Sequence, residues 1–202
     1  MIIGIKKINK NINTDNLNQN EVERINGYQS RKRRYESFTS LLMLTEILEE
    51  KNINNFEIGR FNSGKPYIKE SNLYFNLSHS NDYAACVVSK FQVGIDIEKI
   101  RSRIRRIAPR FLHEKELIKF NDNKLSNKEL TIQWTIKEAF TKFLGAGLTI
   151  PFNKIEIKKI KDYYIANYKE IDGFIKTFFS NDYVVSVCSN NLDSISNRLV
   201  EY

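Results

Sequence analysis

Cysteine and histidine are scarce in this sequence, with two residues of each among 202. So few thiols and imidazoles, none of them clustered, exclude a zinc site built from the usual Cys and His ligands. Both cysteines, Cys86 and Cys188, stand in valine-rich runs typical of buried strands. We therefore expect two free, buried thiols and a reducing compartment such as the cytoplasm.

Long hydrophobic runs are also missing. The first five residues lead directly into Lys6 and Lys7, so we expect no signal peptide. The longest apolar patch, Leu41–Leu44, is far too short to cross a bilayer. With 41% hydrophobic and 28% charged residues, the composition is that of a soluble globular protein, and we expect no membrane partner.

Acidic residues are outnumbered by basic ones, since 24 Asp and Glu stand against 32 Lys and Arg, giving a net charge of +8. Such a balance indicates a polyanionic or acidic partner. Nucleic acid, a small molecule with several phosphate groups and an acidic protein would each satisfy it. Composition alone leaves this choice open.

The two halves of the chain share a short segment. Ser80–Tyr83 and Ser180–Tyr183 both read Ser-Asn-Asp-Tyr, and each leads into a valine-containing run. This pattern is typical of a turn that enters a buried strand. Because the copies lie half a chain length apart, they predict a duplicated α/β unit, which we divide into residues 1–100 and 101–202.

Hydrophobic periodicity and turn signals predict the elements of both halves. Helices are expected at 31–50, 103–121 and 127–144, and strands at 83–89, 92–98, 153–160, 163–169, 173–179 and 183–189. We expect the first two strands to pair as a hairpin after a loop over 78–83. Gly145 and Gly147 are expected to end the last helix, and Pro151 to prevent its resumption.

The segment Gly94–Glu98, Gly-Ile-Asp-Ile-Glu, alternates as a strand does. Ile95 and Ile97 face one side, and Asp96 and Glu98 face the other, so two carboxylates lie on one surface above an apolar underside. A lone Asp-x-Glu is more often a pair of surface carboxylates on an edge strand. The apolar alternate positions and a second acidic motif favour a functional site here.

That second motif is a helical segment. Trp134, Glu138 and Lys142 stand at positions i, i+4 and i+8, and therefore form one stripe, separate from the apolar stripe of the same helix. Glu138 and Lys142 could form a simple helix salt bridge worth about 0.2–0.5 kcal/mol. Three carboxylates that converge with a lysine nearby would instead suit Mg²⁺, which prefers a few carboxylate oxygens and completes its shell with water and phosphates.

Four short motifs stand in order between residues 64 and 142, and together they resemble those of the 4′-phosphopantetheinyl transferases. They are Gly64–Tyr67, Phe75–Ser80, Gly94–Glu98 and Trp134–Lys142. The resemblance is greatest to the surfactin-synthetase-activating type. It implies an α/β fold of two similar halves related by a pseudo-twofold axis, with the active site in the cleft between them. It also implies transfer of the phosphopantetheine group of coenzyme A to a serine of an acyl or peptidyl carrier protein.

The resemblance assigns the acidic residues to metal binding and catalysis. Asp96, Glu98 and Glu138 would bind Mg²⁺. Glu138 would also help take the proton from the attacking serine, directly or through a water, and Lys142 would stabilise phosphate charge. Trp134 is expected to pack in the core or the cleft wall.

The same resemblance assigns Lys65, Ser78 and His79 to coenzyme A, with His79 as a ligand of the 3′-phosphate and not a general base. The family often places a further basic residue inside the helix that follows the run Arg31–Arg34. The segment Ser37–Ser40 offers no positive charge at that point. Either the basic run substitutes for it or the affinity for the 3′-phosphate is reduced, and the sequence leaves both alternatives open.

The carrier protein is expected to dock on exposed apolar residues around Phe111 and Leu112, while His113 is expected to be structural. Two cleft-forming halves in one chain favour a monomer. A metal-dependent nuclease is an alternative, but Lys99 directly follows Glu98 and would point away from the acidic face. A nucleic-acid-binding module is another, although the aromatic residues stand mainly in core-like positions. We therefore expect no nucleic-acid partner.

Overall fold

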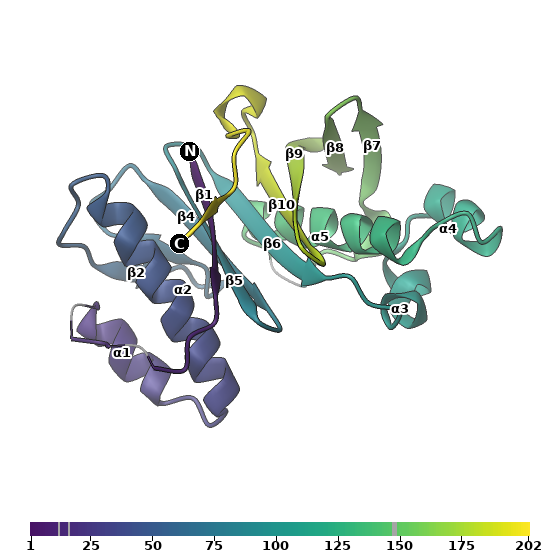
Figure 1. Cartoon of the computed structure of the whole chain (residues 1–202). Helices are drawn as coiled ribbons and strands as arrows, with labels where there is room; N and C mark the ends of the chain where they lie inside the picture. Colours follow the sequence, from purple (N-terminus) through teal and green to yellow (C-terminus); the bar gives the residue numbers. More distant parts are fainter. Residues whose placement is uncertain (12, 16, 147–148) are drawn as a thin grey trace.

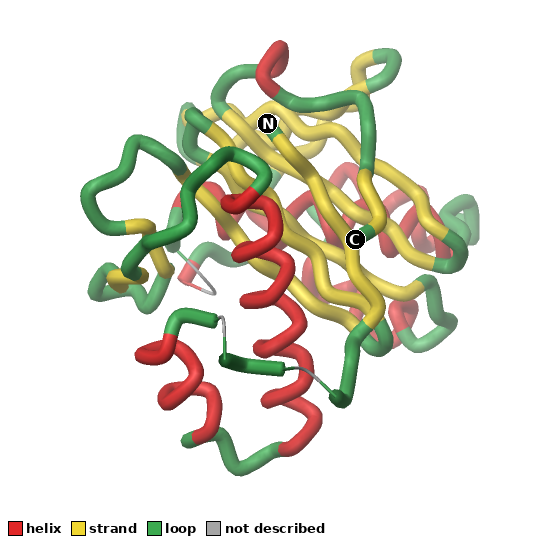
Figure 2. Tube along the Cα trace, turned by 60° about the vertical axis from the view of Figure 1, so that its left-hand side comes forward, coloured by secondary structure: helices red, strands yellow, loops and turns green. Residues whose placement is uncertain are grey.

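The computed structural model describes residues 1–11, 13–15, 17–146 and 149–202, so Gly147 lies outside the described residues. Two sheets pack against each other, and a long helix covers the outer face of each (Figure 1). These helices are α2 (Arg31–Glu49) and α5 (Asn127–Leu144). Figure 2 shows the long helix α2 in front of the strands and further helices behind them.

The first sheet has the strand order β11-β1-β5-β4. Its strands are β1 (Ile2–Lys7), β4 (Tyr74–Ser80), β5 (Tyr83–Ser89) and β11 (Val200–Glu201). Cys86 and Val88 of β5 share one buried cluster with Leu44 and Ile47 of α2. The helix α1 (Gln19–Asn26) packs on α2, and β2 (Ile58–Arg60) and β3 (Pro66–Ile68) pair as a separate hairpin.

The second sheet has the order β6-β10-β9-β8-β7. Its strands are β6 (Val93–Lys99), β7 (Glu156–Ile160), β8 (Tyr163–Tyr168), β9 (Ile171–Ser180) and β10 (Tyr183–Ser189). Ile136 and Phe140 of α5 are buried in one cluster with Ile175 and Cys188 of this sheet. The two cysteines are free and buried, as predicted.

The strand β6 shows how the layers set the direction of the acidic side chains. Ile95 and Ile97 belong to the buried cluster between the two sheets, together with Ile5 and Val87 of the first sheet. Side chains alternate along a strand, so Asp96 and Glu98 point to the opposite face, where α5 packs. The alternation predicted from the sequence is therefore present.

The predicted duplication is visible in the backbone. The Asn81 and Asn181 residues of the two repeated segments both have a left-handed φ, of 55° and 50°. The N–H of Ile8 donates to the carbonyl of Asp82 at 2.7 Å, and the N–H of Ile100 donates to that of Asp182 at 2.7 Å. Each half thus closes the same turn onto an equivalent strand.

Two predictions about the first half are wrong. Residues 83–89 and 92–98 do form strands, but they do not pair as a hairpin, because β1 and β4 flank β5 on both sides while β6 pairs with β10. Residues 78–80 continue β4 and do not form a loop. The sheets also do not follow a division at residue 100, since β6 lies in the second sheet and β11 returns to the first.

The helix expected over 103–121 is broken in two. The helices α3 (Ile104–Phe111) and α4 (Glu114–Asn121) meet at His113, which caps α4 in a capping box with Glu116. The structural role expected for His113 is thus confirmed. Within the described residues, no helix combines the length and the apolar composition that spanning a bilayer requires.

Candidate active site

A cavity of about 410 Å³ lies between the N-terminal helices, the acidic strand and α5. It brings together six of the seven residues predicted for the site: Ser78, His79, Asp96, Glu98, Glu138 and Lys142 line it, whereas Lys65 does not. Acidic groups line the part next to α5, and arginines from α1, α2 and β2 line another part.

Asp96 is the centre of the acidic part. Its carboxylate is buried on β6, and its Oδ1 accepts hydrogen bonds from Lys142 Nζ at 2.7 Å and Ser78 Oγ at 2.8 Å. Lys142 Nζ also donates to Ser78 Oγ at 2.8 Å, so strand β4, strand β6 and helix α5 meet in one polar cluster. The second oxygen, Asp96 Oδ2, is buried and has no hydrogen-bond partner among the residues that the structure describes.

Glu98 lies two residues further along the same face of β6. Its Oε2 accepts a hydrogen bond from Ser80 Oγ at 2.7 Å. Burial, and the negative charge of Asp96, raise the pKa of Glu98 above its usual range. Ser80 was not predicted as a site residue, although its place in the Ser-His-Ser motif was visible in the sequence.

Glu138 enters the cavity from α5, whose capping box at Ser126 and left-handed Gly145 define its two ends. Burial raises the pKa of Glu138 to about 7, and the charges of Asp96 and Glu98 contribute in the same direction. A carboxyl group with a pKa near neutrality is suited to accept or donate a proton at physiological pH.

The carboxylates Asp96, Glu98 and Glu138 line one cavity, but they are not gathered around a point. In the part of the chain that the structure describes, no three His, Cys, Asp or Glu side chains form a group that could hold a metal ion. Their chemistry nevertheless fits a hard cation. All three offer carboxylate oxygens, and the unpartnered Asp96 Oδ2 is a buried oxygen that still needs a donor or a cation.

His79 lies at the cavity wall beside Glu36 of α2. Its Nδ1 is 3.4 Å from Glu36 Oε2, and Lys32 Nζ is 3.5 Å from the other carboxylate oxygen. Burial lowers the pKa of His79, against the opposing effect of the Glu36 charge. The structure therefore brings His79 to the cavity, with Glu36 as a neighbour that sequence analysis did not identify.

Sequence analysis also missed two arginines of the cavity, Arg24 and Arg60, whereas Arg33 belongs to the basic run that it singled out. Arg24 of α1 and Arg60 of β2 both donate to the buried carboxylate of Glu21, with shortest distances of 2.6 and 2.7 Å. Arg33, from the basic run at the start of α2, stacks over the ring of Tyr28 with its guanidinium carbon 4.2 Å from the ring centre. Isolated basic residues give no periodic signal, so only the packing of α1, α2 and β2 reveals that they converge.

Lys65 is the predicted residue that the structure does not bring to the others. Its Nζ donates to the carbonyl oxygens of Lys142 at 2.6 Å and Phe143 at 3.2 Å, at the end of α5. Burial lowers the pKa of Lys65 to about 8. The expected phosphate contact of this residue is therefore not part of the described cavity.

The docking patch predicted around Phe111 and Leu112 is wrong. The two side chains are 1% and 0% exposed, because α3 turns them onto α5. Phe111 packs edge-on against Trp134 at 5.2 Å between ring centres, which agrees with the packing role predicted for Trp134. A helix as short as α3 has too few turns to show which of its faces is buried. The sequence alone therefore does not tell whether an apolar residue beside basic ones is buried or exposed.

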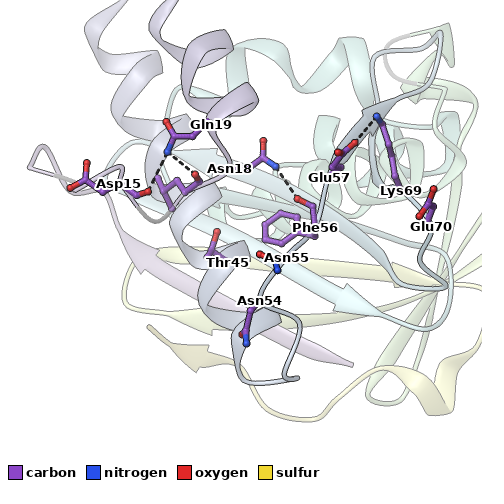
Figure 3. Close-up of a pocket in the computed structure, with 11 residues that line it drawn as sticks. Asp15, Asn18, Gln19, Thr45, Asn54, Asn55, Phe56, Glu57, Lys69 and Glu70 are labelled. Atoms are coloured by element: carbon purple, nitrogen blue, oxygen red, sulfur yellow. Dashed lines mark hydrogen bonds and ion pairs between the residues drawn. The ribbon is translucent and has the colours of Figure 1, made fainter.

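Further cavities lie outside this cluster. One, of about 330 Å³, shares Glu98 with the active-site cavity and has Trp134, Ile104 and Ile107 in its wall. Another, of about 620 Å³, lies beside α1 and the loop before β2 (Figure 3). Its one lysine, Lys69, is already paired with Glu57, and its remaining charged groups are acidic, so it does not suit a phosphate-rich ligand.

Comparisons with known proteins identify the family of the chain. Residues 92–188 match the family model described as 4′-phosphopantetheinyl transferase superfamily, and residues 9–91 match the model described as 4′-phosphopantetheinyl transferase, N-terminal. The boundary between the matches falls just before β6. The match over residues 92–188 therefore contains both acidic motifs.

Individual relatives give the same result. A 4′-phosphopantetheinyl transferase of Aneurinibacillus migulanus is 31% identical over 188 residues, which cover 89% of this chain and 78% of the relative. A 4′-phosphopantetheinyl transferase of Bacillus subtilis is 31% identical over 141 residues, which cover 64% of this chain and 61% of the relative. Among solved structures, the holo-[acyl-carrier-protein] synthase of Neisseria meningitidis matches with a TM-score of 0.42 and 22% identity, covering 50% of this chain and 98% of that one. The chain belongs to the 4′-phosphopantetheinyl transferase superfamily, and it is an enzyme of the two-half, surfactin-synthetase-activating type.

Proposed function

We propose that this enzyme transfers the 4′-phosphopantetheine group of coenzyme A to a serine of an acyl or peptidyl carrier protein, with Mg²⁺, and releases adenosine 3′,5′-bisphosphate. One observation carries the proposal. The cluster of Lys142, Asp96 and Ser78 shares its cavity with Glu138, whose pKa is about 7, and with arginines at another part of the wall. One cavity thus offers a base, a cation beside it and a place for phosphates.

The residues in the acidic part of the cavity have different roles in the proposed reaction. Glu138 is the group suited to take the proton of the attacking serine hydroxyl, because its pKa lies near the working pH. The Lys142 ammonium is suited to the negative charge that develops on the transferred phosphoryl group. Asp96, Glu98 and Glu138 share one cavity without being gathered around a point, so their carboxylates would have to converge to hold Mg²⁺, which would supply charge neutralisation at the diphosphate of coenzyme A.

The arginine-lined wall is suited to the nucleotide end of coenzyme A. Arg24 and Arg60 share the charge of Glu21, whereas Arg33 is paired with no carboxylate among the described residues and stacks only on Tyr28. Arg33 is therefore the guanidinium best placed to take the 3′-phosphate, with His79 nearby in the same wall. In this proposal Arg33 would supply the positive charge that the segment Ser37–Ser40 lacks.

The cavity of about 330 Å³ that shares Glu98 with the active site is suited to the carrier protein. Trp134, Ile104 and Ile107 provide an apolar wall, and three arginines together with Lys99 provide positive charge at its edge. These arginines are Arg101, Arg103 and Arg106. Charge complementarity indicates an acidic, amphipathic helix as its occupant, and the shared Glu98 makes this surface continuous with the active site.

Intact-mass measurement tests the proposed function. Candidate apo-carriers are incubated with the enzyme, coenzyme A and Mg²⁺, and we expect a gain of one phosphopantetheine group. EDTA and Glu138→Gln should each abolish that gain. Cleavage of DNA in a parallel reaction with unmodified carriers would instead support a nuclease. Sedimentation of the same sample tests the proposal that the enzyme is a monomer without a nucleic-acid partner.

A further inference from the structure

The side chain of Lys65 connects the turn between β2 and β3 to the last turn of α5. Its Nζ lies 2.6 Å from the Lys142 carbonyl oxygen, 3.2 Å from that of Phe143 and 3.4 Å from that of Val93. The division of roles proposed above gives this ammonium no function. Its three acceptors are all backbone oxygens, two of them at the end of the helix that carries Glu138.

The end of a helix is a suitable place for a positive charge. The last carbonyl groups of α5 lack partners within the helix and form the negative end of its dipole. Gly145, with a left-handed φ of 72°, donates its N–H to the Lys142 carbonyl, and Lys65 donates to the same oxygen. A carbonyl oxygen accepts two hydrogen bonds, so these two donors complete the hydrogen bonding of the Lys142 backbone.

The turn that carries Lys65 is itself fixed. The N–H of Phe61 donates to the Lys65 carbonyl at 3.0 Å, and the N–H of Gly64 donates to the Phe61 carbonyl at 2.8 Å. Gly64 has a φ of 83°, which suits glycine. The backbone from which the Lys65 side chain starts is therefore held in place.

Two further contacts hold the same end of α5. Gln92 Nε2 donates to the Phe143 carbonyl at 2.5 Å. Gly94 lets the helix backbone lie directly on β6, because a Cβ at this position would be 2.1 Å from the Ala139 carbonyl oxygen. Lys65, Gln92 and Gly94 all come from residues before α3, and all three act on the backbone of α5.

We propose that Lys65 is a positioning residue that fixes the C-terminal turn of α5 and thereby sets where the Lys142 and Glu138 side chains lie relative to Asp96. This inference rests on the proposed function for its kinetic readout. It assigns Lys65 to the helix backbone and not to a phosphate of coenzyme A. The distinction matters because the two roles affect different steps: a phosphate ligand controls coenzyme A affinity, whereas a positioning residue controls turnover at saturating substrate.

The test uses Lys65→Met, which keeps the length of the side chain but removes its charge and its hydrogen bonds. We expect unchanged affinity for coenzyme A, measured by calorimetry, and a turnover lower by roughly ten- to a hundredfold, as small displacements of reacting groups produce. Gln92→Leu should give the same kind of change, because Gln92 does not line the active-site cavity and donates to the Phe143 carbonyl at the same end of α5. The matched control is Lys69→Met, on the same hairpin, whose exposed ammonium pairs with Glu57.

Hydrogen exchange gives a readout that needs no activity. The amides of Gly145 and Ala146 should exchange faster in Lys65→Met than in wild type and Lys69→Met, because the end of α5 loosens. Unchanged exchange, or a loss of coenzyme A affinity of about tenfold without a change in turnover, would overturn the proposal. If the wild type modifies no carrier, the proposed function fails, while the exchange data still decide whether Lys65 holds the helix.

Discussion

The ammonium of Lys142 lies 2.7 Å from Asp96 Oδ1 and joins the helix α5 to the strand β6. The first half contains the same arrangement with the charges exchanged, since Lys6 of β1 lies 2.6 Å from Glu46 of α2. Asp96 and Lys6 each stand two residues after a glycine whose neighbour across the sheet is a cysteine. The duplicated unit thus carries an ion pair in both halves, and only the second half places the carboxylate on the strand beside further acidic groups.

Glu138→Gln should change both activity and stability with pH. Glu138 acts as a base only when ionised, so wild-type activity should rise through a pH of about 7, and the variant should lose roughly 10²–10⁴-fold in turnover without that rise. The folded pKa lies above the unfolded value, so the folded wild type loses stability as pH rises from 4.5 to about 7. The variant should become the more stable protein over this interval, as unfolding in urea at several pH values would show. Equal pH dependence of the two proteins would contradict the assignment.

Arg33→Ala should weaken binding of coenzyme A and leave binding of dephospho-coenzyme A unchanged. A charged hydrogen bond contributes about 1.5–3 kcal/mol, so the loss in affinity should be about tenfold or more. Calorimetry with both ligands measures the difference. Arg31→Ala is the matched control, because Arg31 is exposed in the same run and does not line the cavity. An equal loss for both ligands would place Arg33 away from the 3′-phosphate.

Reversing the charge of Arg103 and Arg106 should raise KM for an acidic carrier and leave KM for coenzyme A unchanged. Charges at the rim of an interface act mainly on the association rate, so the effect should shrink as salt is added. Initial rates at two salt concentrations measure this. Arg110→Glu, on the same helix and outside the cavity, is the control. If Arg110→Glu has the same effect, general surface charge and not this cavity recruits the carrier.

Lys137→Met should destabilise the fold although the residue touches no proposed substrate. Lys137 is 0% exposed and donates to Glu116 Oε2 at 2.7 Å and to the Phe111 carbonyl at 2.8 Å, joining α5 to the ends of α3 and α4. Breaking a buried pair by removing one partner costs about 3–5 kcal/mol. Urea unfolding of the variant measures the loss, and Lys128→Met on the same helix, where Lys128 is exposed, is the control. If Lys137→Met lowers the free energy of unfolding by less than Lys128→Met does, the Lys137–Glu116 ion pair contributes little to stability.

The sequence was most informative where one element determines the outcome. Alternation in β6 and the i, i+4 spacing in α5 placed Asp96, Glu98, Glu138 and Lys142 on the correct faces, because each depends only on the period of its own strand or helix. Strand pairing does not depend on one element. Both β5 and β6 are rich in apolar residues, so their sequences gave no sign that each would pair with a different sheet.

The remaining misses concern the direction of single side chains. Arg24 and Arg60 come together only because α1 packs beside β2, and Glu21 holds both. Lys65 stands in a turn from which its long side chain could extend in several directions, and the end of α5 decides which one. Contacts between distant segments depend on tertiary packing, which no local pattern encodes.

The mass of an apo-carrier protein after incubation with this enzyme, coenzyme A and Mg²⁺ tests the central claim most directly. We predict the addition of one phosphopantetheine group at a serine, absent when that serine is replaced by alanine and when Lys142→Met replaces the wild-type enzyme. A folded wild-type enzyme that binds coenzyme A but leaves a range of acyl and peptidyl carriers at their original mass would contradict the account.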